Sequence, residues 1–130
     1  MTEFVIALHA FWSQFGMPAY QQDQVPPFQE FPYITYEALE GAPYTRNVTL
    51  ARAWFAQRMG ESVNVQVGAF LDQVKRAIPP QGVKLSTEDG FFVLSPNGAA
   101  FLSFETDPDT LEDGRQIVSG RVSYEIAYYL

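Results

Sequence analysis

The C-terminal segment carries the feature that most constrains the fold, a regular alternation of apolar and polar side chains. Its apolar face holds Gly120 in register and the residues Val118, Val122, Tyr124, Ile126, Tyr128 and Leu130. Its other face holds Ser119, Arg121, Ser123 and Glu125. A period of two is typical of a half-buried β-strand. At about 3.3 Å per residue, a strand over 117–130 would span roughly 40 Å. It therefore either extends beyond the sheet of its own subunit or is split by a bend at Gly120.

A second strong strand signal begins with a proline and continues with branched and aromatic side chains. Pro32 suits the first position of a strand, where its missing N–H costs no ladder bond. The next four residues are strand formers, so we expect a strand from about Tyr33 to Leu39, ended by a turn over 40–43. A strand over 48–55 then predicts a hairpin with the first. Because its apolar residues lie on both faces, we expect it to be covered on both sides, with Trp54 in the core.

Two segments have helical periodicity. The first places Phe4, Leu8, Phe11 and Phe15 on one face after a possible cap at Thr2, and Gly16 ends it. The second, capped by Ser62 or Asn64, places Val63, Val67, Phe70 or Leu71, Val74 and Ile78 on one face before two prolines. Between strands and helices, the stretch 17–30 is an ordered connector, which we expect Tyr20, Val25 and Phe28 to pin to the domain.

Three further strands are expected before the last one, over 83–87, 91–95 and 99–105. The sequence Ser95-Pro96-Asn97-Gly98 is typical of a hairpin turn between two of them. Together these elements predict the α+β class, with a mixed, mainly antiparallel β-sheet and about two helices packed on it. A length of 130 residues fits a single domain over 1–130.

Composition excludes several kinds of chemistry. The chain has no cysteine, which excludes disulfides, thiolate metal sites and a cysteine nucleophile. A formal net charge of −7 disfavours broad binding to nucleic acid or to an anionic membrane. The apolar run from Phe4 to Trp12 is too short to span a bilayer and follows Glu3 rather than a basic region. We therefore expect a protein that is made and kept in a cytoplasm.

Catalytic motifs are not found in the sequence. It has no phosphate-binding loop and no nucleophile elbow, and its one histidine, His9, has no sequence neighbour that would make it a ligand. An acidic stretch with carboxylates at Asp107, Asp109, Glu112 and Asp113 resembles a calcium loop, but Leu111 stands where a ligand is needed. We favour a solvated loop between two strands, and predict no catalytic residue, cofactor or metal.

Several stretches together resemble a known family. They are Phe15-Gly16-Met17-Pro18-Ala19-Tyr20, Val25-Pro26, the segment from Phe31 to Glu37, Ala53-Trp54-Phe55, the Val-rich helix before Ile78 and the hydrophobic C-terminal strand. In this order they are similar to the tail-terminator or tail-completion proteins, often labelled minor capsid proteins, of long-tailed bacteriophages and prophages of Gram-positive bacteria. The first forty residues are the most specific part of the resemblance.

The resemblance implies a structural protein of the virion neck that is made in the bacterial host cytoplasm. It implies a hexameric ring that caps the finished tail tube, with the tail tube protein and the head–tail connector as partners. Two rivals stay open: another neck or head-completion protein, and a small α+β enzyme or ligand-binding domain built around the acidic loop.

We predict the residues of the subunit interface from their side-chain types rather than from a sequence motif. Tyrosine is enriched at protein interfaces, and we expect exposed interface side chains among Tyr124, Tyr128, Tyr129, Asp107, Asp109, Glu112 and Asp113. The long last strand cannot be fully paired by the shorter strands predicted here. We therefore expect one of its edges to pair with a neighbouring subunit, so that deletion of 128–130 abolishes the ring.

Overall fold

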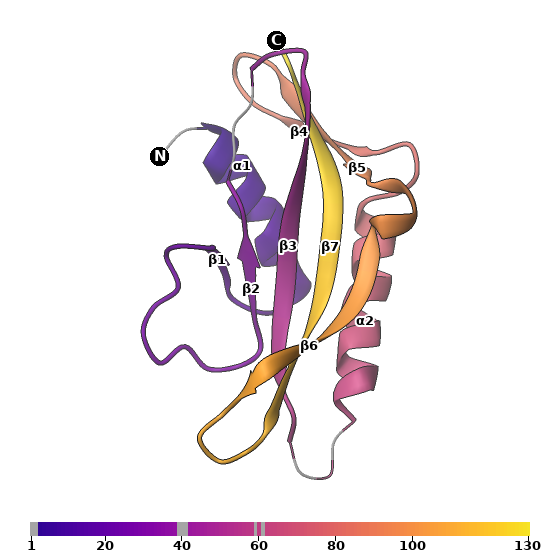
Figure 1. The fold of residues 1–130 in the computed structure, drawn as a ribbon. Coiled ribbons are helices and arrows are strands. Elements are labelled where there is room, and N and C mark those ends of the chain that lie inside the picture. The colour runs from indigo at the N-terminus through magenta and orange to yellow at the C-terminus, as the bar shows by residue number, and fades with distance from the viewer. Residues whose placement is uncertain (1–2, 39–41, 59, 61) are drawn as a thin grey trace.

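The computed structural model describes residues 3–38, 42–58, 60 and 62–130, in which a curled mixed sheet carries two α-helices (Figure 1). This confirms the predicted α+β class. The helical elements are α1 (Glu3–Trp12), the 3-10 turn η1 (Ser13–Phe15), α2 (Val63–Ala77) and the 3-10 turn η2 (Gly98–Ala100). The strands are β1 (Ala19–Gln21), β2 (Tyr33–Tyr36), β3 (Arg46–Ala56), β4 (Val83–Ser86), β5 (Phe91–Pro96), β6 (Leu102–Thr110) and β7 (Gln116–Tyr129).

The last strand, β7, is the centre of the sheet. The strand order is β1-β2-β3-β7-β5-β4, and β6 also pairs with β7. One edge of β7 is paired with β3 over 117–127, and the other edge is divided between β6 over 116–122 and β5 over 124–129. The strand is continuous through Gly120. The strand therefore neither extends beyond the sheet of its own subunit nor is split by a bend at Gly120, so both predicted alternatives are wrong. The prediction that one edge of this strand is free is also wrong, because β5 and β6 lie end to end along its second edge.

The loop between β5 and β6 explains this arrangement. The predicted hairpin at 95–98 is wrong, since β5 and β6 run in the same direction along β7 rather than pairing with each other. Asn97 holds the loop to β7, because its side-chain amide donates to Ser123 Oγ at 2.9 Å. The Ser123 N–H donates to the carbonyl of Phe101 at 2.8 Å. The chain therefore leaves β7 for a few residues and returns to the same edge.

The core lies between the sheet and the helices, which cover the same face. Trp12 contacts Tyr124, and Phe15 contacts Phe70 of α2, at ring centroid distances of 5.4 and 5.7 Å. Gly120 permits close packing of α2, because a Cβ atom there would lie 3.1 Å from Phe70 Cδ2. Both predicted helices are confirmed, and Gly16 ends the first with a φ of 79°. The strand predicted from Tyr33 to Leu39 ends earlier, at Tyr36, and residues 37–38 are not part of it. Thr2 and Leu39 themselves lie outside the described residues.

The opposite face of the sheet is not covered by a helix in the described part of the chain. The odd-numbered residues of β3 face the core, whereas Val48 is exposed and Leu50, Arg52 and Trp54 are only partly buried. The expectation that β3 is covered on both sides is therefore wrong, and Trp54 is not a core residue. The apolar character of its second face reflects cross-strand packing along the sheet rather than a second helical layer.

The connector over 17–30 contains a strand that the sequence did not indicate. Residues 19–21 form β1, which pairs in parallel with β2 at the edge of the sheet. Tyr20 and Val25 are partly buried, as expected for pins. Phe28 is not a pin, because its side chain is completely exposed. Its backbone adopts a left-handed conformation, with a φ of 61°.

Candidate functional site: the open face and the exposed aromatic turns

The open face of the sheet carries a small ionic network at its centre. Arg52 of β3 and Arg121 of β7 are directly paired across the two strands, which places two cations side by side. Glu105 of β6 bridges them, with its carboxylate oxygens 3.3 Å from Arg52 Nη1 and 3.5 Å from Arg121 Nη1. All three side chains are about one-third exposed. The Glu105 carboxylate therefore offsets the repulsion between the two arginines and links β6 to β3 and β7.

A shallow depression of about 380 Å³ lies beside this network. Trp54 forms part of its wall, donates from Nε1 to Thr35 Oγ1 at 2.9 Å and lies under the Arg52 guanidinium. Tyr33 also lines it, and burial, followed by the charge of Asp107, raises the pKa of its phenol. The full lining is Gln22, Val25, Tyr33, Thr35, Glu37, Leu50, Ala51, Arg52 and Trp54. This lining offers hydrogen bonds and an aromatic surface for binding, but no paired nucleophile and base.

The predicted acidic loop is the end of a β-hairpin. Asp107 and Asp109 lie on β6, while Glu112 and Asp113 lie in the turn before β7. Asp113 accepts hydrogen bonds from the Arg115 backbone N–H and from Arg115 Nε, at 3.1 and 2.6 Å. The backbone hydrogen bond is the main reason that the pKa of Asp113 is lowered. In the described ranges, no three His, Asp or Glu side chains are grouped to hold a metal ion.

The three tyrosines expected at an interface do not behave alike. Tyr124 is fully buried and accepts a hydrogen bond from Trp12 Nε1 at 3.2 Å, so the expectation that it is exposed is wrong. Burial raises the pKa of its phenol strongly. Tyr128 stacks on Phe92 and Tyr129 stacks on Phe91, at centroid distances of 4.4 and 5.2 Å. Both attach β5 to β7, so a deletion of 128–130 would damage the sheet as well as any interface.

The one histidine of the sequence, His9, contacts a buried tyrosine. His9 is exposed on α1, and its Nδ1 lies 2.9 Å from the hydroxyl of the buried Tyr36. Burial raises the pKa of Tyr36, so this phenol is neutral and able to donate at physiological pH. The pair joins α1 to β2, as expected for a histidine that packs on the domain.

Two exposed aromatic turns were not predicted. Phe28 and Tyr44 are the non-glycine residues with positive φ in the described chain, at 61° and 65°. Phe28 is completely exposed and Tyr44 is 67% exposed. Each follows a proline, which matches the type II turn pattern of proline at the second position and positive φ at the third. Glycine or asparagine normally occupies that third position, so an aromatic residue there needs a reason beyond turn formation.

The outer edge of β6 is a further exposed feature. In the part of the chain that the structure describes, no strand pairs with β6 on the side away from β7. Phe104, the third residue of this strand, is 46% exposed. An unpaired strand with an exposed aromatic side chain is a template for pairing with another chain.

Comparison with known proteins gives no family for this chain: no family model and no curated protein matches it. Among the described helices, none is both long and apolar enough to cross a lipid bilayer.

Proposed function

We propose that this protein is a structural subunit of the neck of a long-tailed bacteriophage. It forms a hexameric ring that caps the tail tube and joins it to the head connector. The observation that carries the proposal is the set of apolar groups presented to solvent: the left-handed aromatic residues Phe28 and Tyr44 and the unpaired strand β6 with Phe104. Such groups, rather than a pocket with converging chemistry, are what an assembly subunit needs.

The resemblance of the sequence supports the same function. It implies a mixed sheet with helices on one face, and the arrangement of α1 and α2 agrees with that expectation (Figure 1). The segment from Phe31 to Glu37, which carries much of the resemblance, forms β2 and the approach to it. The open face and the exposed turns are then available for neighbouring subunits, for the tail tube and for the connector.

The rival built around the acidic loop loses its main requirement. It needs a deep pocket lined by Asp107, Asp109 and Glu112, but these residues lie along a hairpin where Asp109 and Glu112 are exposed. The depression beside Trp54 keeps a ligand-binding domain as the second candidate, because Arg52 and Glu37 both line it. A ligand would then raise the melting temperature of the wild-type protein but not that of Arg52→Ala.

Electron microscopy tests the proposed function. Purified protein, alone and mixed with tail tubes assembled from the tube protein of the same phage genome, is imaged in negative stain. We expect sixfold rings and tubes with one closed end. In a phage that lacks the gene, tails should be of irregular length, and the wild-type gene should restore one length. Tubes that stay open and tails of normal length without the gene would exclude a terminator. A different copy number on the virion would favour another neck protein.

A further inference from the structure

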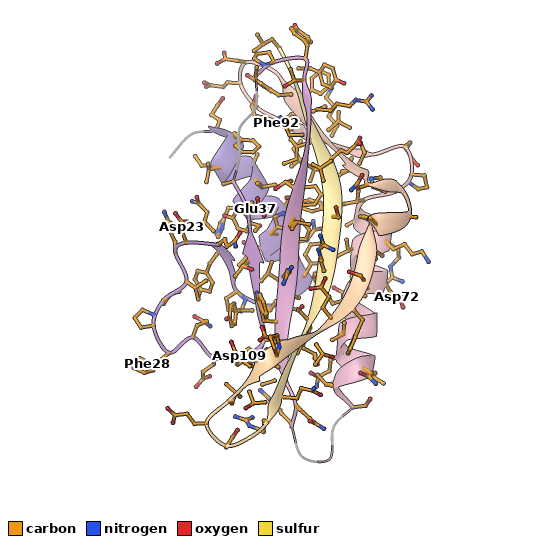
Figure 2. The ribbon with its side chains drawn as sticks, in the orientation of Figure 1. Asp23, Phe28, Glu37, Asp72, Phe92 and Asp109 are labelled. Atoms are coloured by element: carbon orange, nitrogen blue, oxygen red, sulfur yellow. The ribbon has the colours of Figure 1, made fainter. Side chains whose placement is uncertain are left out.

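The segment around Phe28 is a turn, tied to the domain near both of its ends, that presents an apolar ring to solvent. The side chain is completely exposed, and Figure 2 shows it directed away from the sheet. The base of the turn is fixed, because the Gln24 N–H donates to the Gln21 carbonyl at 2.9 Å. Tyr20 also donates from its hydroxyl to Gln29 Oε1 at 2.7 Å. Two prolines precede Phe28. We call residues 24–29 the Phe28 turn.

The other side of the molecule carries a complementary apolar strip. Phe104 of β6 is directly paired with Gly120 of β7, and a Cβ atom at Gly120 would lie 3.2 Å from Leu71 Cδ2 of α2. Directly opposed residues of antiparallel strands point to the same face, so Phe104 lies next to α2. Leu71 and Leu102 are partly buried against the core. We call Leu71, Leu102 and Phe104, with the unpaired edge of β6, the Phe104 strip.

These two surfaces lie on opposite sides of the domain. In Figure 1 the segment over 22–30 projects beyond β1 and β2, while α2 and the first half of β6 lie beyond β7 on the other side. A contact that joins one side of a subunit to the opposite side of the next is heterologous, and such contacts close into a ring when the rotation allows it. A knob and an acceptor on the same side would instead favour a two-fold dimer.

Charge indicates which partner fits. Residues 17–38 contain no lysine or arginine but three carboxylates, of which Asp23 and Glu30 are exposed and flank the Phe28 turn in sequence. In contrast, α2 ends with the exposed residues Lys75 and Arg76 and has one acid, Asp72, which gives a formal charge of +1 (two cations minus one carboxylate). Of the three carboxylates on β6, Glu105 is already paired with Arg52 and Arg121 on the open face, and Asp107 and Asp109 lie farther along the strand. Lys75 follows Leu71 by one helical turn and so lies on the same side of α2 as the Phe104 strip. Asp23 and Glu30 are therefore complementary to Lys75 of another copy.

We propose that copies of this chain associate head to tail, with the Phe28 turn of one copy seated on the Phe104 strip of the next. This inference names the subunit contact of the proposed ring and rests on that function. The phenyl ring of Phe28 packs on Phe104 and Leu71, and β6 gains a neighbour along its free edge. Each subunit uses both surfaces once, so a closed ring leaves neither exposed.

The first experiment uses complementation between two defective variants. Phe28→Asp removes the knob and Phe104→Asp removes the acceptor, and both positions are exposed, so thermal melting should show folded proteins. We expect each variant alone to lose the ring and to sediment as a monomer. An equimolar mixture has one intact contact per pair, and we expect it to form 1:1 dimers. Ile6→Asp, at an exposed apolar side chain of α1 that belongs to neither surface, is the matched control and should form rings like the wild type.

Cysteine cross-linking gives an independent readout, because the chain has no native cysteine. If the two side chains meet, F28C and F104C bring their Cα atoms within the roughly 7 Å that a disulfide requires. Oxidised glutathione should then convert the mixture of F28C and F104C to a covalent dimer. The doubly substituted chain should give a ladder that ends at the closed ring. I6C mixed with F104C should stay monomeric on a non-reducing gel, because Ile6 is exposed but lies on neither surface.

Several results would overturn the inference. Cross-linking of F28C with itself would indicate a two-fold contact, and an equal yield from I6C mixed with F104C would indicate random collision. Rings that persist in Phe28→Asp but fail to bind tail tubes would assign the turn to the tube protein instead. If the equimolar mixture of Phe28→Asp and Phe104→Asp stays monomeric, the Phe28 turn and the Phe104 strip do not bind each other. If F28C and F104C cross-link as described but the wild type never caps tails, the contact stands and the proposed function fails. If Phe28→Asp forms rings and caps tails normally, the proposed function stands and the contact fails.

Discussion

The two faces of the sheet use the same strands but hold them together by different means. On the helix-covered face, small residues such as Ala51, Ala53 and Gly120 let large side chains from α1 and α2 come close. On the open face, the small residues Ser119 and Ser123 lie between long or bulky side chains and are buried without a covering layer. Apolar packing between layers therefore stabilises one face, whereas hydrogen bonds and ion pairs within one layer stabilise the other.

The difference shows why a free face can belong to a stable domain. Burial of apolar area on one side supplies most of the favourable free energy, so the second side can carry partly exposed groups such as Trp54 and Arg52. Substitutions on the two faces should then differ in size even when the residue types are the same.

The two tryptophans give the largest expected contrast. Trp12 is fully buried among core rings, whereas Trp54 is partly exposed and makes one hydrogen bond, to Thr35. We expect Trp12→Ala to lower the free energy of unfolding by about 3–5 kcal/mol because it leaves a large cavity. Trp54→Ala should cost about 1–2 kcal/mol, well below the value for a core position. Urea denaturation of both variants measures the contrast, and equal losses would mean that the open face contributes as a second core.

Two glycines should respond to the same substitution with opposite sign. An alanine Cβ at Gly120 would lie 3.1–3.3 Å from Phe70, Leu71 and Val67, so Gly120→Ala should cost about 1–3 kcal/mol by forcing α2 outward. At Gly68, on α2, no heavy atom lies within 4 Å of the added Cβ. Gly68→Ala should stabilise the protein by about 0.5–1 kcal/mol through helix propensity. The melting temperatures of the two variants test both signs, and a neutral Gly120→Ala would show that α2 can shift freely.

Periodicity predicted one face of the sheet well and the other poorly. The alternation in β7 correctly placed Val122 on the helix-covered face and Ser123 on the open face, although both residues are buried. The residue types alternate because only one face of this strand lies under the helices. The same reasoning misplaced Trp54, since an apolar side chain on the open face looks the same in sequence as one that lies under a helix. Tyr124 was assigned to an interface by residue type, although its own strand pattern placed it with Val122 and Ile126 in the core.

The exposed contacts of the candidate site were the least predictable from sequence. Pairing of two strands along one edge of β7 is a long-range arrangement that short turn signals such as Pro96-Asn97 do not encode. Phe28 was predicted to pin the connector to the domain because it is apolar, and the residue type alone does not reveal a positive φ. The proline before each exposed aromatic residue was the available signal, since proline followed by a left-handed residue defines a type II turn.

The stability of the protein at alkaline pH should depend on the burial of its tyrosines, above all Tyr124. Burial raises the pKa of Tyr124 above its ordinary value near 10, as it does for Tyr36 and Tyr33. Below about pH 10 these phenols are neutral in both the folded and the unfolded protein, so their contribution to the free energy of unfolding is fully present. As the pH rises further, only the unfolded chain ionises easily, so stability falls.

Tyr124→Phe tests this assignment directly. At neutral pH we expect a loss of about 1–2 kcal/mol, because Trp12 Nε1 is left buried without its acceptor. Above pH 10 the variant should lose stability less steeply than the wild type, so the difference between them should narrow. Urea midpoints at several pH values measure the two slopes. Parallel slopes would mean that Tyr124 ionises equally well in the folded protein.

The ionic network of the open face should give the smallest effect and the one most sensitive to salt. Glu105→Gln leaves Arg52 and Arg121 side by side without a carboxylate, so we expect a loss of no more than about 1 kcal/mol at low ionic strength. Salt screens both the lost attraction and the new repulsion, and in about 1 M NaCl the Debye length is only about 3 Å. The difference from the wild type should then shrink. Glu125→Gln is the matched control on the same face and should have no measurable effect, because Glu125 pairs at 3.8 Å with Arg46, whose side chain is largely exposed. A loss for Glu105→Gln that does not change with salt would assign the role of this carboxylate to packing of β6 against β7, and the open face would then resemble the covered face more than its charges suggest.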